Sequence, residues 1–284
     1  MIPFFISSEM EAAQRKMKAA LAAPGEKCLR VAIFGTSHVR RVFDDCAGRL
    51  MKSEPQSGAV VQNMFLLPAS FSDQVDITMF GVGGLTMLQF WNNYYMPSSS
   101  VSRKLFNISD FFREVRERGT ECIILQIGDN DVDDFVDFQI ANSQSLDAKT
   151  TADDIIQEIL RVAHFLQSEC KAKCIFLLPI MPRYIKGQLD KREKIDNYNA
   201  VAEQVNSGLQ TLLENDEVIK FFHGGKKFHF TGDSYIHRAE QFDDDYGVHL
   251  KMGQSPSHYG WILDNMKRCI FLAYHNSKKK EEET

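Results

Sequence analysis

Four short segments contain residue types that are suited to acyl transfer. Ser37 follows an apolar run and a Gly-Thr turn, which places it at the end of a predicted strand and the start of a predicted helix. Gly84 lies in a glycine-rich turn after a second apolar run, Asn130 follows a third, and His249 comes just before the last predicted helix. A histidine can accept the proton of a serine hydroxyl, and backbone N–H groups and an asparagine amide can donate to a developing oxyanion. These residues suggest that a serine acts as a nucleophile.

Each of these residues also has an ordinary structural explanation. A serine at a helix N-terminus is commonly a cap, and glycines commonly form turns. His249 is one of eight histidines, and a single histidine is more often structural than catalytic. His38 is adjacent to Ser37, but neighbouring side chains at a helix start point in different directions. We therefore expect His38 at the surface.

The elements that must position these residues alternate between strands and helices. Apolar runs predict five strands, at residues 29–35, 75–81, 121–128, 173–180 and 218–223. Helical patterns follow at residues 38–52, 109–118, 151–170, 192–214 and 259–273. This alternation predicts a five-stranded parallel sheet in a three-layer α/β/α arrangement, where sites form beyond the carboxyl ends of the strands.

The chain divides into one large domain and two terminal segments. We predict the main domain at residues 28–276, an N-terminal helical extension at 1–27 and a charged, solvated tail at 277–284. Two long stretches, 53–73 and 96–107, are predicted as loops. Such loops are either binding walls beside the sheet edge or insertions without a defined structure.

Charge and hydropathy exclude several classes of function. The formal net charge is −5, and no basic block is longer than residues 278–280, which argues against binding to a nucleic-acid backbone. The apolar runs are far shorter than the roughly 20 residues that cross a bilayer. The first residues lack the charged start and long apolar run of a secretory signal, so we expect an intracellular, cytoplasmic protein.

The sequence predicts neither a metal site nor a nucleotide site. Its six cysteines contain no C-x-x-C pair, and we expect buried free thiols. A calcium loop starting at Asp129 would need Gly at its sixth position and Glu at its twelfth, where this chain has Asp134 and Ile140. The glycine-rich turn around Gly84 lacks the spacing of a phosphate-binding fingerprint. These segments therefore predict neither a calcium loop nor a nucleotide phosphate site.

In order, approximate spacing and strand-end context, the blocks around Ser37, Gly84, Asn130 and His249 resemble those of the SGNH hydrolases, also called GDSL esterases and lipases. The resemblance covers about residues 29 to 275. A Tyr198-Asn199 and Asn206 pattern on the fourth predicted helix strengthens it.

The resemblance implies a flavodoxin-like α/β/α sandwich and assigns a role to each block. Ser37 would be the nucleophile and His249 the base. The backbone N–H groups of Ser37 and Gly84 and the Asn130 side chain would form the oxyanion hole. Members of the family hydrolyse carboxylic or acetyl esters, thioesters or lysolipids, so a small-molecule ester is the implied substrate, with no cofactor and an oligomeric state that stays open.

The sequence departs from the family pattern at two places. The first block usually reads Gly-Asp-Ser, but Thr36 stands where the aspartate is expected. A literal Gly-Asp-Ser that ends at Ser234 lies in the wrong context and is interpreted as a decoy. The last block usually reads Asp-x-x-His, but the residue three before His249 is Tyr246. Either Asp245, one residue earlier, serves as the acid, or the site is a Ser–His dyad.

Two functions from different classes follow. The first is a serine esterase, an acyl or acetyl hydrolase of the SGNH type, with Ser37, His249 and Asp245 as catalytic residues. The second is a catalytically silent SGNH-like domain that uses the same pocket to bind a partner or an acyl ligand. Tyr246 in the place of the acid separates the two. Flavin or nucleotide binding is disfavoured because the phosphate loop is missing.

Overall fold

The structure is a computed structural model. It describes residues 28–47, 56–57, 65, 67, 71, 74–95, 108–142, 147–183, 192–222, 250 and 259–282. The predictions for the N-terminal extension, the 96–107 loop, Ser234, Asp245, Tyr246 and His249 lie outside these residues.

The described strands form a six-stranded sheet in the order β2-β3-β1-β4-β5-β6. The strands are β1 (Leu29–Gly35), β2 (Gln56–Ser57), β3 (Val75–Gly81), β4 (Cys122–Gln126), β5 (Cys174–Leu177) and β6 (Ile219–Phe221). All neighbours are parallel except β2, which pairs antiparallel with β3. The five parallel strands follow the flavodoxin-like order 2-1-3-4-5. The predicted five-stranded parallel sheet is confirmed, and the two residues of β2 add an edge strand inside a stretch that was predicted as loop.

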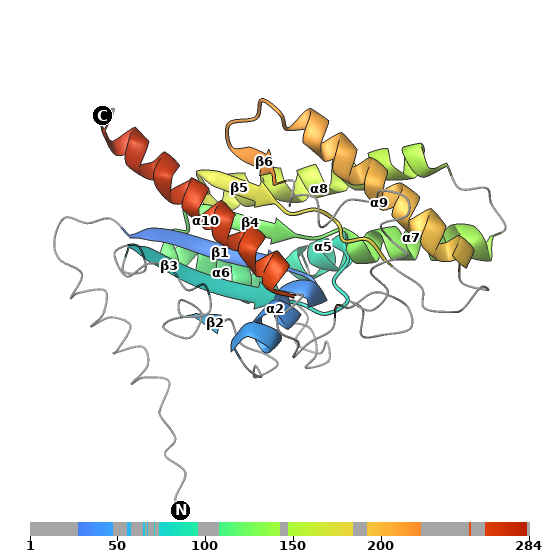
Figure 1. The fold of residues 1–284 in the computed structure, drawn as a ribbon, viewed down its shortest axis with the longest axis horizontal. Coiled ribbons are helices and arrows are strands. Elements are labelled where there is room, and N and C mark those ends of the chain that lie inside the picture. The colour runs from blue at the N-terminus through green and yellow to red at the C-terminus, as the bar shows by residue number, and fades with distance from the viewer. Residues whose placement is uncertain are drawn as a thin grey trace, which may run out of the picture.

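Helices cover both faces of the sheet, which confirms the three-layer arrangement. They are α2 (Ser37–Ala47), α5 (Met87–Tyr95), α6 (Ile108–Arg118), α7 (Asp129–Ala141), α8 (Ala148–Cys170), α9 (Arg192–Leu212) and α10 (Tyr259–Glu282). Buried residues of α5 to α9 form one apolar core with one face of the sheet, and those of α2 and α10 form a second core with the other face. Figure 1 shows α10 and α2 on the near side of the sheet.

Two of these helices, α5 and α7, are absent from the sequence prediction. The apolar stripe of α7 is short. After Asp129 at its start, the buried residues of this helix are Val132 and Val136, and aspartates surround them in the sequence. The acidic segment that begins at Asp129 is thus a helix rather than a calcium loop. Gly128, with φ of 103°, makes the left-handed turn between β4 and α7.

The last helix is longer than predicted. It continues to Glu282, so residues 277–282 of the predicted charged tail form the last turns of α10. Tyr274, beyond the predicted helix end, packs on Phe71 with ring centroids 4.5 Å apart, and Lys278 lies 5.8 Å from the Tyr274 ring. These contacts extend the apolar face of α10 into the charged region. No helix in the described part of the chain is long and apolar enough to span a membrane.

Five cysteines whose side chains the structure describes are free, and three of them are buried as predicted. Cys122, Cys170 and Cys269 are buried, and Cys28 and Cys174 are partly exposed. Burial raises the pKa of the Cys170 thiol to about 11, so this thiol is protonated and unreactive at neutral pH.

Candidate active site

The first three strands of the parallel sheet end level with one another at the edge where the site is predicted. Gly35 of β1 is in register with Gly81 of β3 and with Gln126 of β4. The N–H of Val82 donates to the Gly35 carbonyl at 2.8 Å and extends this alignment past the strand ends. Helix α2 begins at Ser37, immediately beyond this edge, and the Ser37 side chain is partly exposed there.

The first turn of α2 rests directly on the end of β3. A Cβ atom built on Gly81 would lie 2.4 Å from the backbone nitrogen of Arg40 and 2.6 Å from its Cα. Non-bonded contacts this short do not occur in folded proteins, so any side chain at this position must push α2 away from the sheet. The position of Ser37 at the start of α2 therefore depends on a glycine in β3.

Asn130 and the glycine-rich turn lie together, although they are far apart in the sequence. The Asn130 Nδ2 donates to the carbonyl of Leu85 at 2.9 Å, and Leu85 is the neighbour of Gly84. Gly84 has φ of 73°, which explains the glycine at this turn. A side-chain amide carries two N–H donors, so the bond to Leu85 leaves the second available for an oxyanion.

Asp131 makes a second contact from α7 to the same loop. Its Oδ1 accepts a hydrogen bond from the N–H of Met87, the first residue of α5, at 2.8 Å. The start of α5 also has a capping box, since the Thr86 Oγ1 accepts from Gln89 N and the Gln89 Oε1 accepts from Thr86 N, both at 3.3 Å. Burial, opposed by the hydrogen bond from Met87, raises the pKa of Asp131 to about 6.

A chain of buried polar groups lies beneath Ser37 and accommodates the first departure from the family pattern. Thr36, with 1% of its surface exposed, donates from Oγ1 to the Gln126 Oε1 at 2.7 Å. The Gln126 Nε2 donates to the Asp129 Oδ2, and the N–H of Met181 donates to the Asp129 Oδ1 at 3.2 Å. The threonine that replaces the usual aspartate is thus linked to a carboxylate through one glutamine.

His38 is buried, with 3% of its surface exposed, so the expected surface position is wrong. Its ring lies 6.5 Å from the ring of Tyr259, the first residue of α10. The first turn of α2 is covered by the start of α10, a contact between distant segments that local sequence does not indicate. His38 is a packing residue between these two helices.

The segment that follows β5 is held by side chains of α9. The Asn206 Oδ1 accepts from the N–H of Ile180 at 2.9 Å, and its Nδ2 donates to the Ile180 carbonyl at 3.0 Å. The Tyr198 hydroxyl donates to the Met181 carbonyl at 3.3 Å. These are the residues of the α9 pattern that strengthens the resemblance, and their role is to satisfy an irregular backbone at the same edge of the sheet.

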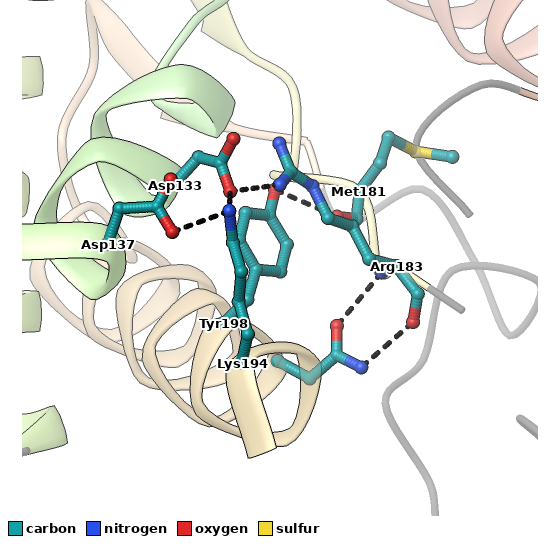
Figure 2. A network of polar contacts seen from close by, with 7 residues as sticks. Asp133, Asp137, Met181, Arg183, Lys194 and Tyr198 are labelled. Carbon is teal, nitrogen blue, oxygen red and sulfur yellow. Dashed lines mark hydrogen bonds and ion pairs between the residues drawn. The ribbon is translucent and has the colours of Figure 1, made fainter. Parts of the chain in front are cut away.

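Arg183, at the end of this segment, joins α9 to α7 (Figure 2). The Asn199 Oδ1 accepts from the Arg183 N–H, and its Nδ2 donates to the Arg183 carbonyl, each at 2.9 Å. The Arg183 guanidinium lies 4.0 Å from the centre of the Tyr198 ring and forms an ion pair with Asp133 of α7. The desolvation cost of burying this cation is offset by its contacts with an aromatic face and a carboxylate.

Lys194 completes this network of charges. Its Nζ lies 3.1 Å from the Asp133 carboxylate and 2.6 Å from the Asp137 carboxylate (Figure 2). Hydrogen bonds to the two aspartates raise the pKa of Lys194, although its partial burial acts in the opposite direction. The network fixes α7, and with it the first turn that carries Asn130.

Three of the five predicted site residues, Ser37, Gly84 and Asn130, follow strands that end at the same edge of the sheet, and Asn130 is bonded to the residue after Gly84. His249 and Asp245 lie outside the described residues, so their roles stay predictions. The contact of Asp131 with the glycine-rich loop is absent from the sequence prediction. No local pattern indicates this contact, although the Thr86-x-x-Gln89 capping box does indicate the helix that begins at Met87.

Comparisons with known proteins agree with this geometry at the level of the fold. No protein-family model matches the chain, and no curated protein matches its sequence. A lipase from a goat rumen metagenome matches with a TM-score of 0.54 at 13% identity, over 85% of this chain and 97% of the lipase. A catalytic mutant of an acetylxylan esterase from Geobacillus stearothermophilus matches with a TM-score of 0.50 at 14% identity, over 86% of this chain and 94% of the esterase. The chain therefore shares the α/β fold of this lipase and this esterase.

Proposed function

We propose that this chain is a serine ester hydrolase of the SGNH type that acts on a small-molecule ester. Ser37 is the nucleophile and His249 the general base. The backbone N–H groups of Ser37 and Gly84 and the side-chain amide of Asn130 form the oxyanion hole. No cofactor takes part in this reaction.

One observation carries the proposal: the hydrogen bond from Asn130 to the carbonyl of Leu85, beside Gly84. It joins a potential side-chain donor and a potential backbone donor at the edge where α2 begins at Ser37. Oxyanion stabilisation is strongest when such donors are in place before the reaction, because no free energy is then spent on reorienting them as the negative charge develops. A serine that was only a helix cap would not need them.

The reaction proceeds in two halves. In the first, the Ser37 Oγ attacks the ester carbonyl carbon while His249 takes the hydroxyl proton, and the carbonyl oxygen becomes an oxyanion held by Gly84 and Asn130. Collapse breaks the bond to the alcohol, which leaves with the proton from His249, and the acyl group stays on Ser37. In the second half, water attacks the acyl-serine by the same route and releases the acid.

The orientation of His249 is the variable part of this proposal. Asp245 is the proposed acceptor for its Nδ1 proton, because Tyr246 occupies the usual position of the acid. In serine proteases, loss of the triad aspartate lowers turnover by about 10⁴ and still leaves catalysis well above the rate in water. A dyad at this site would therefore be slow rather than inactive.

Labelling with a fluorophosphonate tests the proposal, because this probe reacts only with an activated serine. We expect the wild type to be labelled between pH 6 and 9 and the Ser37→Ala variant to remain unlabelled. Ser234→Ala is the matched control and should be labelled like the wild type. Loss of labelling in Ser234→Ala, with labelling retained in Ser37→Ala, would overturn the assignment of the nucleophile.

The alternative function is a catalytically silent domain that binds an acyl ligand or a partner at the same edge. The presence of Tyr246, three residues before His249, favours this function, because tyrosine does not supply a carboxylate to the histidine. A wild-type protein that is folded but unlabelled across this pH range would favour it over the hydrolase.

A further inference from the structure

Two adjacent side chains at the start of α7 hold the loop between β3 and α5, and the proposed function uses only one of them. Asn130 donates to the Leu85 carbonyl at 2.9 Å, and Asp131 accepts from the Met87 N–H at 2.8 Å. Both bonds span more than forty residues of sequence. The loop that carries Gly84 is thus attached to α7 at two points, two residues apart.

The bond from Asp131 adds to the capping of α5. The capping box satisfies the N–H groups of Thr86 and Gln89, and Asp131 accepts from the separate N–H of Met87. Because Asp131 comes from another helix, this bond also connects α5 to α7. Its consequence is a fixed distance between the Gly84 loop and Asn130.

The attachment at the ends of the loop bears on Gly84 because little packs against this residue itself. Among the described residues, and apart from its chain neighbours, no atom lies within 4 Å of a Cβ atom built on Gly84, whereas the Arg40 guanidinium lies 3.4 Å from one built on Gly83. The position of the Gly84 N–H therefore depends on the attachment of the loop to β3 on one side and to α7 on the other. A shift of about 1 Å in a catalytic group can cost about 10²-fold in rate, so this attachment matters for an oxyanion hole.

The environment of Asp131 also disfavours the charged form of its carboxylate. Its Oδ2 is buried and has no hydrogen-bond partner among the described residues. The charges that act on it are the carboxylates of Asp134 and Asp129 on its own helix, and both are unfavourable. Helix α5, against which it packs, contains no charged residue. Buried ionisable groups of this kind cluster at functional sites, where stability is exchanged for activity.

We propose that Asp131 is a positioning residue of the oxyanion hole, which holds the Gly84 loop so that the Gly84 N–H and the Asn130 amide point at the same oxygen. This inference rests on the proposed function. Asp131 touches neither the substrate nor Ser37 in this role. It acts through the Met87 N–H and the loop.

The test is to replace Asp131 and to separate kcat from KM on a generic short-chain ester. Asp131→Ala removes the acceptor, and we expect kcat to fall about 10- to 100-fold with KM changed less than about twofold, because only the transition state carries the oxyanion. Asp131→Asn keeps an acceptor oxygen for Met87, and we expect it to restore kcat to within about fivefold of the wild type. Asp134→Ala, an exposed carboxylate on the same helix, is the matched control and should leave both constants unchanged.

The effect should also depend on Asn130. In an Asn130→Ala background, replacement of Asp131 by Ala should lower kcat several-fold less than in the wild type, because one of the two donors that it aligns is already gone. Should Asp131→Ala not fold, Asp131→Ser replaces it, since the shorter side chain loses the bond to Met87 while remaining polar.

The outcomes separate this inference from the proposed function. Wild-type turnover together with an unchanged kcat in Asp131→Ala would overturn the positioning role and leave the hydrolase intact. A rise in KM equal to the fall in kcat/KM, or an Asn variant as slow as the Ala variant, would also overturn it. A wild type with neither turnover nor fluorophosphonate labelling would overturn both.

Discussion

Replacement of Asn206 by alanine tests how the segment after β5 is held in place. Asn206 has 8% of its surface exposed, and its amide makes two hydrogen bonds to the backbone of Ile180. Alanine leaves the Ile180 N–H and carbonyl buried without these partners. Each unsatisfied buried group costs about 1–3 kcal/mol, so the two together should lower the free energy of unfolding by about 3 kcal/mol after local relaxation.

Asn199 offers a matched control within the same helix. It makes the same pair of hydrogen bonds, each 2.9 Å long, to the backbone of Arg183, but in a partly exposed environment. Water can replace these bonds, so Asn199→Ala should cost only about 1 kcal/mol.

Urea unfolding followed by circular dichroism measures both losses, and equal m-values would show that the unfolded states are comparable. A total stability of about 5–15 kcal/mol would leave both variants folded in water. If Asn206→Ala cost no more than Asn199→Ala, burial would not be the reason for the strength of the Asn206 contacts.

Four further predictions concern the site. Asn130→Ala should lower kcat by about 10² to 10³ without loss of fold, because one oxyanion donor is removed; undiminished turnover in an ester assay would exclude Asn130 from the site. Gly81→Ala should displace the first turn of α2 and lower both stability and fluorophosphonate labelling, because its Cβ would meet backbone at 2.4 Å; a variant as stable and reactive as the wild type would contradict this packing. The pKa of Asp131 rises from 3.8 to about 6 on folding, so the wild type should lose up to about 3 kcal/mol of stability as pH increases from 4 to above 6. Asp131→Asn should lack this decline, and urea unfolding at pH 4 and pH 7.5 would show it; the same decline in the variant would refute the assignment. Tyr246→Asp should raise turnover if the acid is missing, whereas Asp245→Asn should lower it more than tenfold if Asp245 already serves; a wild type that is labelled and insensitive to both changes would be a dyad.

The strands of the sheet were the most predictable part of this chain. The bounds of β1 and β3 agree with the predicted ranges, because continuous apolar runs that end in glycine leave little choice of structure. The parallel arrangement followed from the alternation of strands and helices. The carboxyl-edge position of Ser37, Gly84 and Asn130 then followed from the parallel strands, since such strands all end on the same side.

Short helices and helices with a weak apolar pattern were not predicted in the same way. Helix α7 has only two core-facing valines among its aspartates, and α5 has only nine residues and follows a glycine-rich turn. The extension of α10 through its lysines depends on the packing of Tyr274 against Phe71. In each case the helix is stabilised by contacts with other elements, and local helix propensity does not reveal such contacts.

The local sequence was sufficient to indicate a serine, a glycine turn and an asparagine at strand ends, because residue type and hydrophobic period are local properties. It was not sufficient to show that Asn130 bonds to Leu85, that Asp131 bonds to Met87, or that His38 is buried beneath α10. These contacts join residues that are 44 or 45 positions apart, or that lie on the first and last described helices. Their geometry exists only after the sheet has aligned its strand ends and the helices have packed on both faces, because a hydrogen bond requires its two groups to be within about 3 Å in the folded chain.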